Sequence, residues 1–245
     1  MKADSNKGLN IAMWSGPRNI STAMMRSFGS REDSFVSDEP MYGHFLLKSG
    51  VSHPMREEVL ESMSTNFNDL TDYLTGDIPN NKAIWYQKQM THHILESDDL
   101  GWLKGLRNTF LIRHPKDVIL SYMEKFNLEE ELIGFKQQDR IYRYVCKFVD
   151  SNPVIIDSKD ILDNPKKMLT KLCDSLNIPF CDRMLSWTMG HHSTDGVWGK
   201  HWYNSVIKTD SFGEYKEKNE SIPDQYMDIY NRSLDLYEKL HQKKI

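Results

Sequence analysis

The feature that most constrains this chain is a strand–loop–helix segment near its start, "IAMWSGPRNISTAMMRSF", residues 11–28. An apolar run enters a Ser-Gly-Pro-Arg-Asn turn and leaves it into a predicted helix. The first N–H groups of a helix have no partners within the helix, and with the helix dipole they form a site for an anion. We therefore expect this loop to bind an anion through Arg18, Asn19, Ile20, Ser21 and Thr22. An ordinary strand–turn–helix with a capping serine has the same outline.

Apolar strands alternate with helical segments along the rest of the chain. The strands are expected at residues 9–14, 34–40, 82–88, 108–113 and 152–158. A single long amphipathic helix is expected over residues 129–150. Several strands are apolar throughout, which is typical of a parallel sheet buried on both faces. The sequence therefore predicts one α/β domain spanning residues 1–245, with a central parallel sheet flanked by helices on both faces.

Four charged residues each come just after a predicted strand: Arg18, Glu39, Lys88 and Arg113. The carboxyl ends of parallel strands meet at one edge of the sheet, and ligands of such folds bind there. We therefore expect these four side chains to converge on one site.

The composition and the cysteines argue against several classes of partner. The formal net charge is −4, which gives no overall attraction to nucleic acid or to an anionic membrane. The three cysteines show no CxxC spacing, which favours a reducing compartment. The sequence starts without the apolar core of a signal peptide, and no stretch approaches the roughly 20 apolar residues of a membrane span. We expect a soluble cytoplasmic protein, with the tail helix as a possible homodimer contact.

A second anion site is predicted by "FLIRHPKDVILSYMEK", residues 110–125. Arg113 lies at a strand end, and Ser121 follows inside the next helix, so a guanidinium and a hydroxyl can hold one anion from two elements. The ATP loop pattern GxxxxGK[ST] is absent, and Asp157 is only a loose candidate for a Mg²⁺ ligand. Two phosphate sites without a clear Mg²⁺ acid suit a nucleotide that is phosphorylated at both ends of its ribose.

These segments resemble the PAPS-dependent sulfotransferases, where PAPS is 3'-phosphoadenosine 5'-phosphosulfate. "GPRNISTA" is similar to the family's loop for the 5'-phosphosulfate, and "RHPKDVILSYM" is similar to its segment for the 3'-phosphate. The resemblance covers residues 9–180. It implies a P-loop-type fold, PAPS as co-substrate without a metal, and Arg113 and Ser121 as ligands of the 3'-phosphate. It also implies, more weakly, a closing loop with Lys200 as its cation and Trp198 or Trp202 as its stacking face.

The resemblance leaves the catalytic base open. Lys88 matches a lysine that stabilises the transferring group, and Arg18 is a second candidate for that role. The family's catalytic histidine, however, falls on Met90, which cannot accept a proton. Glu39 resembles the glutamate base of other branches of the family. The two histidines that follow Met90, His92 and His93, offer an alternative because an unperturbed histidine titrates near pH 6.5.

Three functions follow from these residues. The first is an enzyme that transfers a sulfuryl group from PAPS to a hydroxyl or amine of a small molecule. The second is a Mg²⁺- and ATP-dependent kinase, and the third is a nucleotide-binding module that has lost its base. The Met90 replacement keeps the third open, and the 3'-phosphate segment disfavours the second. The residues carry no signature of a particular acceptor.

Overall fold

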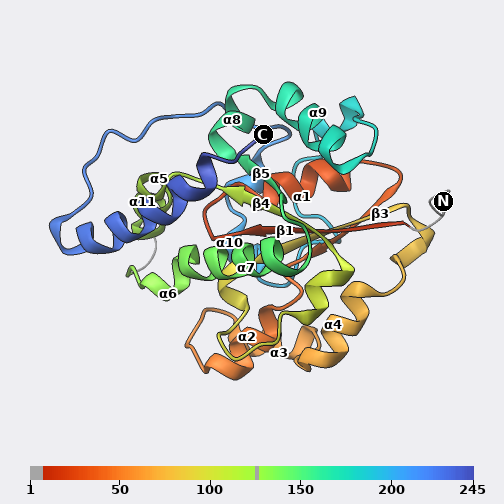
Figure 1. Cartoon of the computed structure of the whole chain (residues 1–245), viewed down its shortest axis with the longest axis horizontal. Coiled ribbons are helices and arrows are strands. Elements are labelled where there is room, and N and C mark those ends of the chain that lie inside the picture. Colours follow the sequence, from red (N-terminus) through yellow and green to blue (C-terminus); the bar gives the residue numbers. More distant parts are fainter. Residues whose placement is uncertain (1–7, 125–126) are drawn as a thin grey trace.

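The computed structural model describes residues 8–124 and 127–245. They fold around a central sheet of five parallel strands (Figure 1). The strand order is β2-β3-β1-β4-β5, and each neighbouring pair is parallel. The strands are β1 (Leu9–Ser15), β2 (Ser34–Asp38), β3 (Ile84–Met90), β4 (Arg107–Ile112) and β5 (Val154–Asp157). The predicted central parallel sheet is therefore confirmed.

Helices cover both faces of the sheet because successive strand residues point to opposite sides. In β1, Ile11 and Met13 pack in one hydrophobic cluster, and Ala12 and Trp14 pack in another. The first cluster is covered by α1 (Ser21–Gly29), α8 (Ser158–Asp163) and α9 (Pro165–Leu176). The second is covered by α4 (Phe67–Thr75), α5 (Pro115–Met123), α7 (Phe135–Phe148) and α11 (Met227–His241). The two clusters confirm the predicted flanking by helices on both faces.

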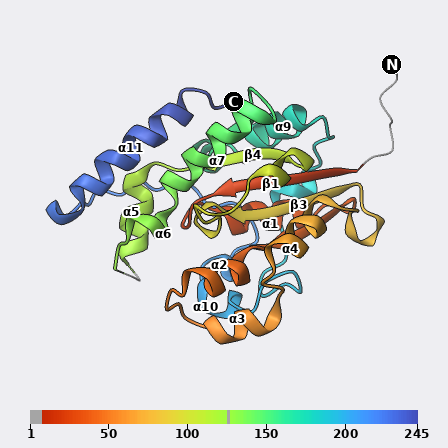
Figure 2. The same cartoon turned by 60° about the horizontal axis from the view of Figure 1, so that its bottom comes forward.

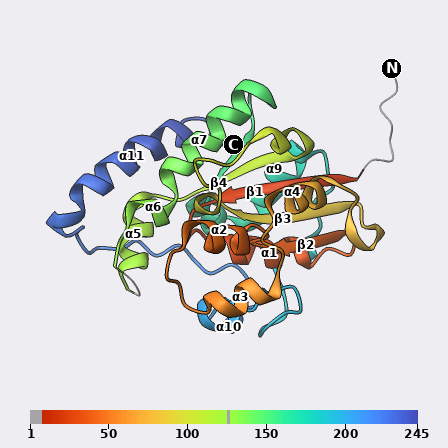
Figure 3. The same cartoon turned by 90° about the horizontal axis from the view of Figure 1, so that it is seen from below.

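A third cluster lies beyond the carboxyl ends of β2 and β3. It is formed by α2 (Tyr42–Ser49), α3 (Arg56–Ser62), α10 (Gly199–Trp202) and the residues around α10. Figures 2 and 3 show α3 beside α10, although the two are far apart in the sequence. This cluster brings the segment around α10 against the end of the sheet. Within the described ranges, no helix is long and apolar enough to cross a membrane.

Gly134 interrupts the long helix predicted over residues 129–150. Its φ of 80° lies in the left-handed region, and it separates α6 (Glu130–Ile133) from α7. The Gly134 carbonyl accepts a hydrogen bond from Thr91 Oγ1 at 2.9 Å, and a Cβ at this position would lie 2.4 Å from the same oxygen. The single-helix prediction was wrong because the apolar spacing continues across a residue whose backbone is set by a tertiary contact.

Candidate active site

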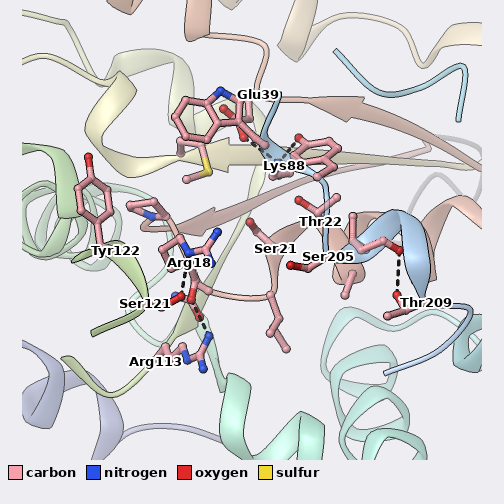
Figure 4. Close-up of a pocket in the computed structure, with 18 of the residues that line it drawn as sticks. Arg18, Ser21, Thr22, Glu39, Lys88, Arg113, Ser121, Tyr122, Ser205 and Thr209 are labelled. Atoms are coloured by element: carbon pink, nitrogen blue, oxygen red, sulfur yellow. Dashed lines mark hydrogen bonds and ion pairs between the residues drawn. The ribbon is translucent and has the colours of Figure 1, made fainter. Parts of the chain in front are cut away.

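A cavity of about 350 Å³ opens beyond the carboxyl ends of the strands. Arg18, Glu39, Lys88 and Arg113 all line it, so the predicted convergence of these residues is confirmed. The other predicted site residues that line it are Asn19, Ile20, Ser21, Thr22, His92, His93 and Ser121. Figure 4 shows the arginines and Ser121 at one end of the cavity and Glu39 with Lys88 at the other.

The anion loop between β1 and α1 has an unusual backbone. Arg18 and Ile20 have φ values of 59° and 48°, a left-handed conformation that a β-branched residue such as isoleucine rarely adopts. Left-handed residues in a loop turn backbone N–H groups toward one side, which is how anion-binding nests form. Asn19 Nδ2 donates to the Leu111 carbonyl at 2.8 Å and so fixes the loop on β4.

This loop is not an ordinary turn with a capping serine. Helix α1 begins at Ser21, and its N-cap residue is Ile20, which offers no side-chain hydrogen bond to the helix. Ser21 is therefore inside the helix, and it lines the cavity together with Thr22. The strained loop thus leaves the start of α1 directed at the cavity, which fits an anion site better than a closed cap.

The second predicted anion site adjoins the first through Arg18. Arg18 Nε donates to Ser121 Oγ at 2.9 Å, and Arg113 Nη1 donates to the Arg18 carbonyl at 2.7 Å. Figure 4 shows Arg18 between Ser121 and Ser21. Burial lowers the pKa of Arg18, Glu124 opposes that change and Arg113 adds to it, but a guanidinium stays charged in proteins. Two guanidinium groups therefore lie together at this end of the cavity.

At the other end, Lys88 is part of a buried ionic cluster. Strand β3 extends two residues beyond the predicted end, so Lys88 lies within the strand and is 1% exposed. Its ammonium donates to Asp38 Oδ1 at 2.9 Å, to Glu39 Oε1 at 2.7 Å and to Tyr203 Oη at 2.6 Å. An ammonium has three N–H groups. Lys88 would therefore have to release a partner before it could bind a transferring group.

Glu39 combines a strained backbone with a perturbed carboxyl group. Its φ is 43° although it precedes Pro40, and residues before proline normally adopt an extended conformation. Its N–H donates to the Lys88 carbonyl at 3.0 Å, which anchors this conformation. Burial raises the pKa of the Glu39 carboxyl, Lys88 lowers it, and Asp38 raises it again, with a net rise. Such strain and such a pKa shift are typical of functional sites.

His92 and His93 lie in a 3₁₀ turn, Thr91–His93, that packs against α2. His93 stacks on Tyr42 with ring centroids 4.6 Å apart, and its Nε2 lies 3.9 Å from Glu39 Oε2. Burial lowers the pKa of His92 to about 3 and places that of His93 well below the ordinary value. Both imidazoles are therefore neutral at physiological pH and are weak bases.

The structure places Trp198 and Lys200 away from the cavity. Trp198 is 3% exposed within the third cluster, where it packs edge-on against Tyr42, and Lys200 is exposed on α10. Trp202, the alternative stacking face, does line the cavity. The tryptophan spacing could not distinguish these positions, because α10 is a single turn whose orientation depends on the third cluster.

Two members of the ionic cluster around Lys88 were not predicted from the sequence. Asp38 precedes Glu39, and its buried carboxylate forms an ion pair with Lys88. Tyr203, 115 residues further along the chain, accepts a hydrogen bond from the same ammonium. The acidic pair "DE" at a strand end was the available signal for Asp38. No local pattern marks Tyr203, because its role depends on how the segment around α10 folds back.

Comparisons with known proteins place this arrangement in a family. A family model described as "Sulfotransferase domain" matches residues 9–243. Branched-chain-amino-acid aminotransferase-like proteins 1 and 2 from Arabidopsis thaliana are 34% and 30% identical to this chain. Both matches cover 93% of this chain and 40% of the relative, so the chain spans less than half the length of these curated relatives.

Solved structures share the fold. The sulfotransferase domain from the curacin biosynthetic pathway has a TM-score of 0.53 at 14% identity, and the match covers 93% of this chain and 98% of that one. The sulfotransferase from Alicyclobacillus acidocaldarius has a TM-score of 0.54 at 10% identity, and the match covers 97% of each chain. At these identities the likeness shows the fold alone. Because the family model spans nearly all of the sequence, the chain belongs to the sulfotransferase domain family.

Proposed function

We propose that this protein is an enzyme that transfers the sulfuryl group of PAPS to a hydroxyl or amine of a small-molecule acceptor and releases adenosine 3',5'-bisphosphate. Family membership supports a sulfotransferase. The observation that carries the donor assignment is the Arg113–Arg18–Ser121 cluster beside the anion loop. It provides two neighbouring positions for anionic oxygens on one cavity, as a nucleotide phosphorylated at both ends requires.

In this proposal the loop and the start of α1 bind the 5'-phosphosulfate, and Arg113 with Ser121 binds the 3'-phosphate. Arg18 lies between the two positions and neutralises charge at both. The backbone N–H groups and fixed cations are in place before the substrate arrives, which is the arrangement that stabilises developing charge most effectively. This chain's groups therefore orient the donor and balance its charge.

Glu39 is the base in this proposal. It accepts the proton of the acceptor as the acceptor's oxygen or nitrogen attacks sulfur and the bond from sulfur to the 5'-phosphate oxygen breaks. Its raised pKa makes it a stronger base than an ordinary carboxylate, whereas the lowered pKa values of His92 and His93 make those residues poorer bases. His93 and Tyr42 then form part of the wall against which the acceptor packs.

The kinase alternative required Asp157 as a Mg²⁺ ligand, and the contacts of Asp157 argue against that role. Asp157 is 1% exposed and caps α8, with Oδ1 accepting from the Lys159 N–H at 2.7 Å and Oδ2 accepting from Tyr237 Oη at 2.7 Å. A carboxylate bound in this way serves the fold. Met90 does line the cavity where a family histidine is expected, so the non-catalytic module is the alternative that the experiment must exclude.

Thermal unfolding with adenosine 3',5'-bisphosphate and, separately, with ATP and Mg²⁺ tests the donor site. We expect only the bisphosphate to stabilise the protein, by about 2.7 kcal/mol at a hundredfold excess over its Kd. Stabilisation by ATP and Mg²⁺ instead would overturn the donor assignment. Release of bisphosphate from PAPS that depends on an acceptor panel of alcohols, phenols and amines then separates an enzyme from a binding module.

A further inference from the structure

The groups that hold Lys88 from behind also bind one another. The Tyr203 hydroxyl accepts from Lys88 Nζ at 2.6 Å and from Trp198 Nε1 at 3.2 Å, and it lies 2.6–2.7 Å from both oxygens of Asp38, to which it donates. Asp38 Oδ2 also accepts from the Gly196 N–H at 3.0 Å. Asp38 and Lys88 are almost fully buried, whereas the Glu39 side chain is 13% exposed. Glu39 is therefore the one carboxylate of this cluster that meets the cavity.

We propose that Asp38 and Tyr203 are positioning residues for the transfer step. Both hold the Lys88 ammonium from behind, Asp38 shares its charge, and Tyr203 donates its proton to Asp38, so that Glu39 faces the acceptor as an aimed carboxylate. This inference rests on the proposed function. If Lys88 faced Glu39 alone, its whole charge would stabilise the Glu39 carboxylate and weaken it as a base. Asp38 pairs with the same ammonium and so reduces the stabilisation of Glu39 by Lys88. The proton that Tyr203 donates to Asp38 limits this reduction.

Each element packed around Glu39 contributes a titratable group. Strand β2 contributes Asp38 and β3 contributes Lys88, while α2 and the turn before Ile94 contribute Tyr42 and His93. Tyr203 completes the set from beyond α10, and its pKa lies well above the ordinary value because it is buried beside Asp38. His93 is neutral and the tyrosines keep their protons, so Asp38 and Lys88 are the charges that set the basicity of Glu39.

The same segment connects this cluster to the donor loop. Asp195, one residue before Gly196, pairs with Arg26 of α1 at 2.7 Å, and both side chains are at most 5% exposed. Helix α1 begins at the anion loop, and Tyr203 follows Gly196 in the same segment. One piece of chain therefore fixes the helix of the donor end and the lysine of the acceptor end relative to each other.

The test is the pH dependence of kcat/KM in Asp38→Asn and Tyr203→Phe, with PAPS saturating. Asp38→Asn leaves the charge of Lys88 on Glu39 alone. We expect the acid limb to move to lower pH by about one unit or more, and the plateau to fall about threefold to tenfold. Tyr203→Phe removes the hydroxyl proton that screens Asp38. The negative charge of Asp38 then acts more strongly on Glu39, so we expect the acid limb to move to higher pH.

The fold supplies matched controls in a second buried tyrosine–aspartate pair, Tyr237 and Asp157, at β5, the edge strand of the sheet opposite to β2. We expect Asp157→Asn and Tyr237→Phe to change unfolding temperature without moving the acid limb. Equal rate losses at every pH in Asp38→Asn and Tyr203→Phe, with the limb unmoved, would overturn the proposal. If Asp38→Asn does not fold, Tyr203→Phe, which deletes only a hydroxyl, still decides by the direction of its shift.

A readout that does not depend on turnover separates this inference from the proposed function. The carboxyl carbon of Glu39 can be titrated by NMR in protein labelled with ¹³C-glutamate, with Glu39→Gln to assign the signal. Absence of transfer by the wild type would sink the proposed function, whereas the opposite shifts of the Glu39 titration in the two variants would still support the charge sharing. Unchanged titration in both variants would sink the inference even in an active enzyme.

Discussion

The two ends of the cavity are built on opposite plans. At the donor end, Arg18 and Arg113 line the cavity beside the backbone N–H groups of the anion loop, and the carboxylate nearest to Arg113, Asp117 at 3.6 Å, is not among the residues that line the cavity. At the acceptor end, Lys88 lies among two carboxylates and a hydroxyl that satisfy one another. The first end presents cations to a ligand, and the second divides one cation between two carboxylates. A transfer reaction uses both kinds of site, because cations hold an anionic donor and a carboxylate can accept a proton from the acceptor.

Among substitutions that test this difference between the two ends, Glu39→Gln is expected to have the largest effect. The amide keeps the size of the side chain but cannot accept the proton, so we expect kcat to fall by about 10²–10⁴-fold. Binding of adenosine 3',5'-bisphosphate should be unchanged, because the donor end is separate. Steady-state kinetics and calorimetric titration measure the two effects. Exposed Glu57→Gln is the control, and a matching loss of bisphosphate affinity in Glu39→Gln would contradict the separation of the two ends.

Lys88→Met tests the balance at the acceptor end through stability. It leaves Asp38 and Glu39 buried together without a counter-ion, so we expect a loss of about 3–5 kcal/mol in the free energy of unfolding at neutral pH. The loss should shrink as pH falls and the two carboxyls take up protons. Chemical denaturation at several pH values measures it, with exposed Lys104→Met as the control. A loss that stays the same at low pH would point to packing instead of charge.

Arg113→Ala sharpens the description of the donor end. A charge-assisted hydrogen bond contributes about 1.5–3 kcal/mol, so bisphosphate affinity should fall by roughly tenfold to a hundredfold. Adenosine 5'-phosphosulfate, which lacks the 3'-phosphate, should bind almost as before. Arg107→Ala is the control, since Arg107 begins β4 and Arg113 follows the other end of that strand. Equal losses for both nucleotides would show that Arg113 does not face the 3'-phosphate.

The smallest expected effect concerns the backbone of the anion loop. Ile20→Gly and Ile20→Ala remove the same packing to within one methyl group, but only glycine adopts a left-handed conformation without strain. We expect the glycine variant to be more stable than the alanine variant by about 1 kcal/mol. Thermal denaturation compares them. Alanine proving the more stable would mean that the loop relaxes out of the left-handed region.

The sequence predicted the donor end better than the acceptor end for a physical reason. The donor end depends on local features that a single segment displays. These are the apolar runs of the strands, the start of α1 and the spacing of Arg113 from Ser121. The partners of Lys88 come from β2 and from a segment 115 residues away, and the single turn of α10 decides whether Trp198 or Trp202 meets the cavity. Such choices depend on tertiary packing, which neither periodicity nor motif resemblance records.

The strained backbone at Glu39 has a consequence for how this protein would respond to selection. Glycine at position 39 would relieve the unfavourable φ and would still leave Lys88 paired with Asp38. Selection for heat tolerance alone would therefore be expected to favour glycine at this position, and the more stable variants would lack the carboxylate proposed as the base. At this single position, higher stability would come at the expense of activity.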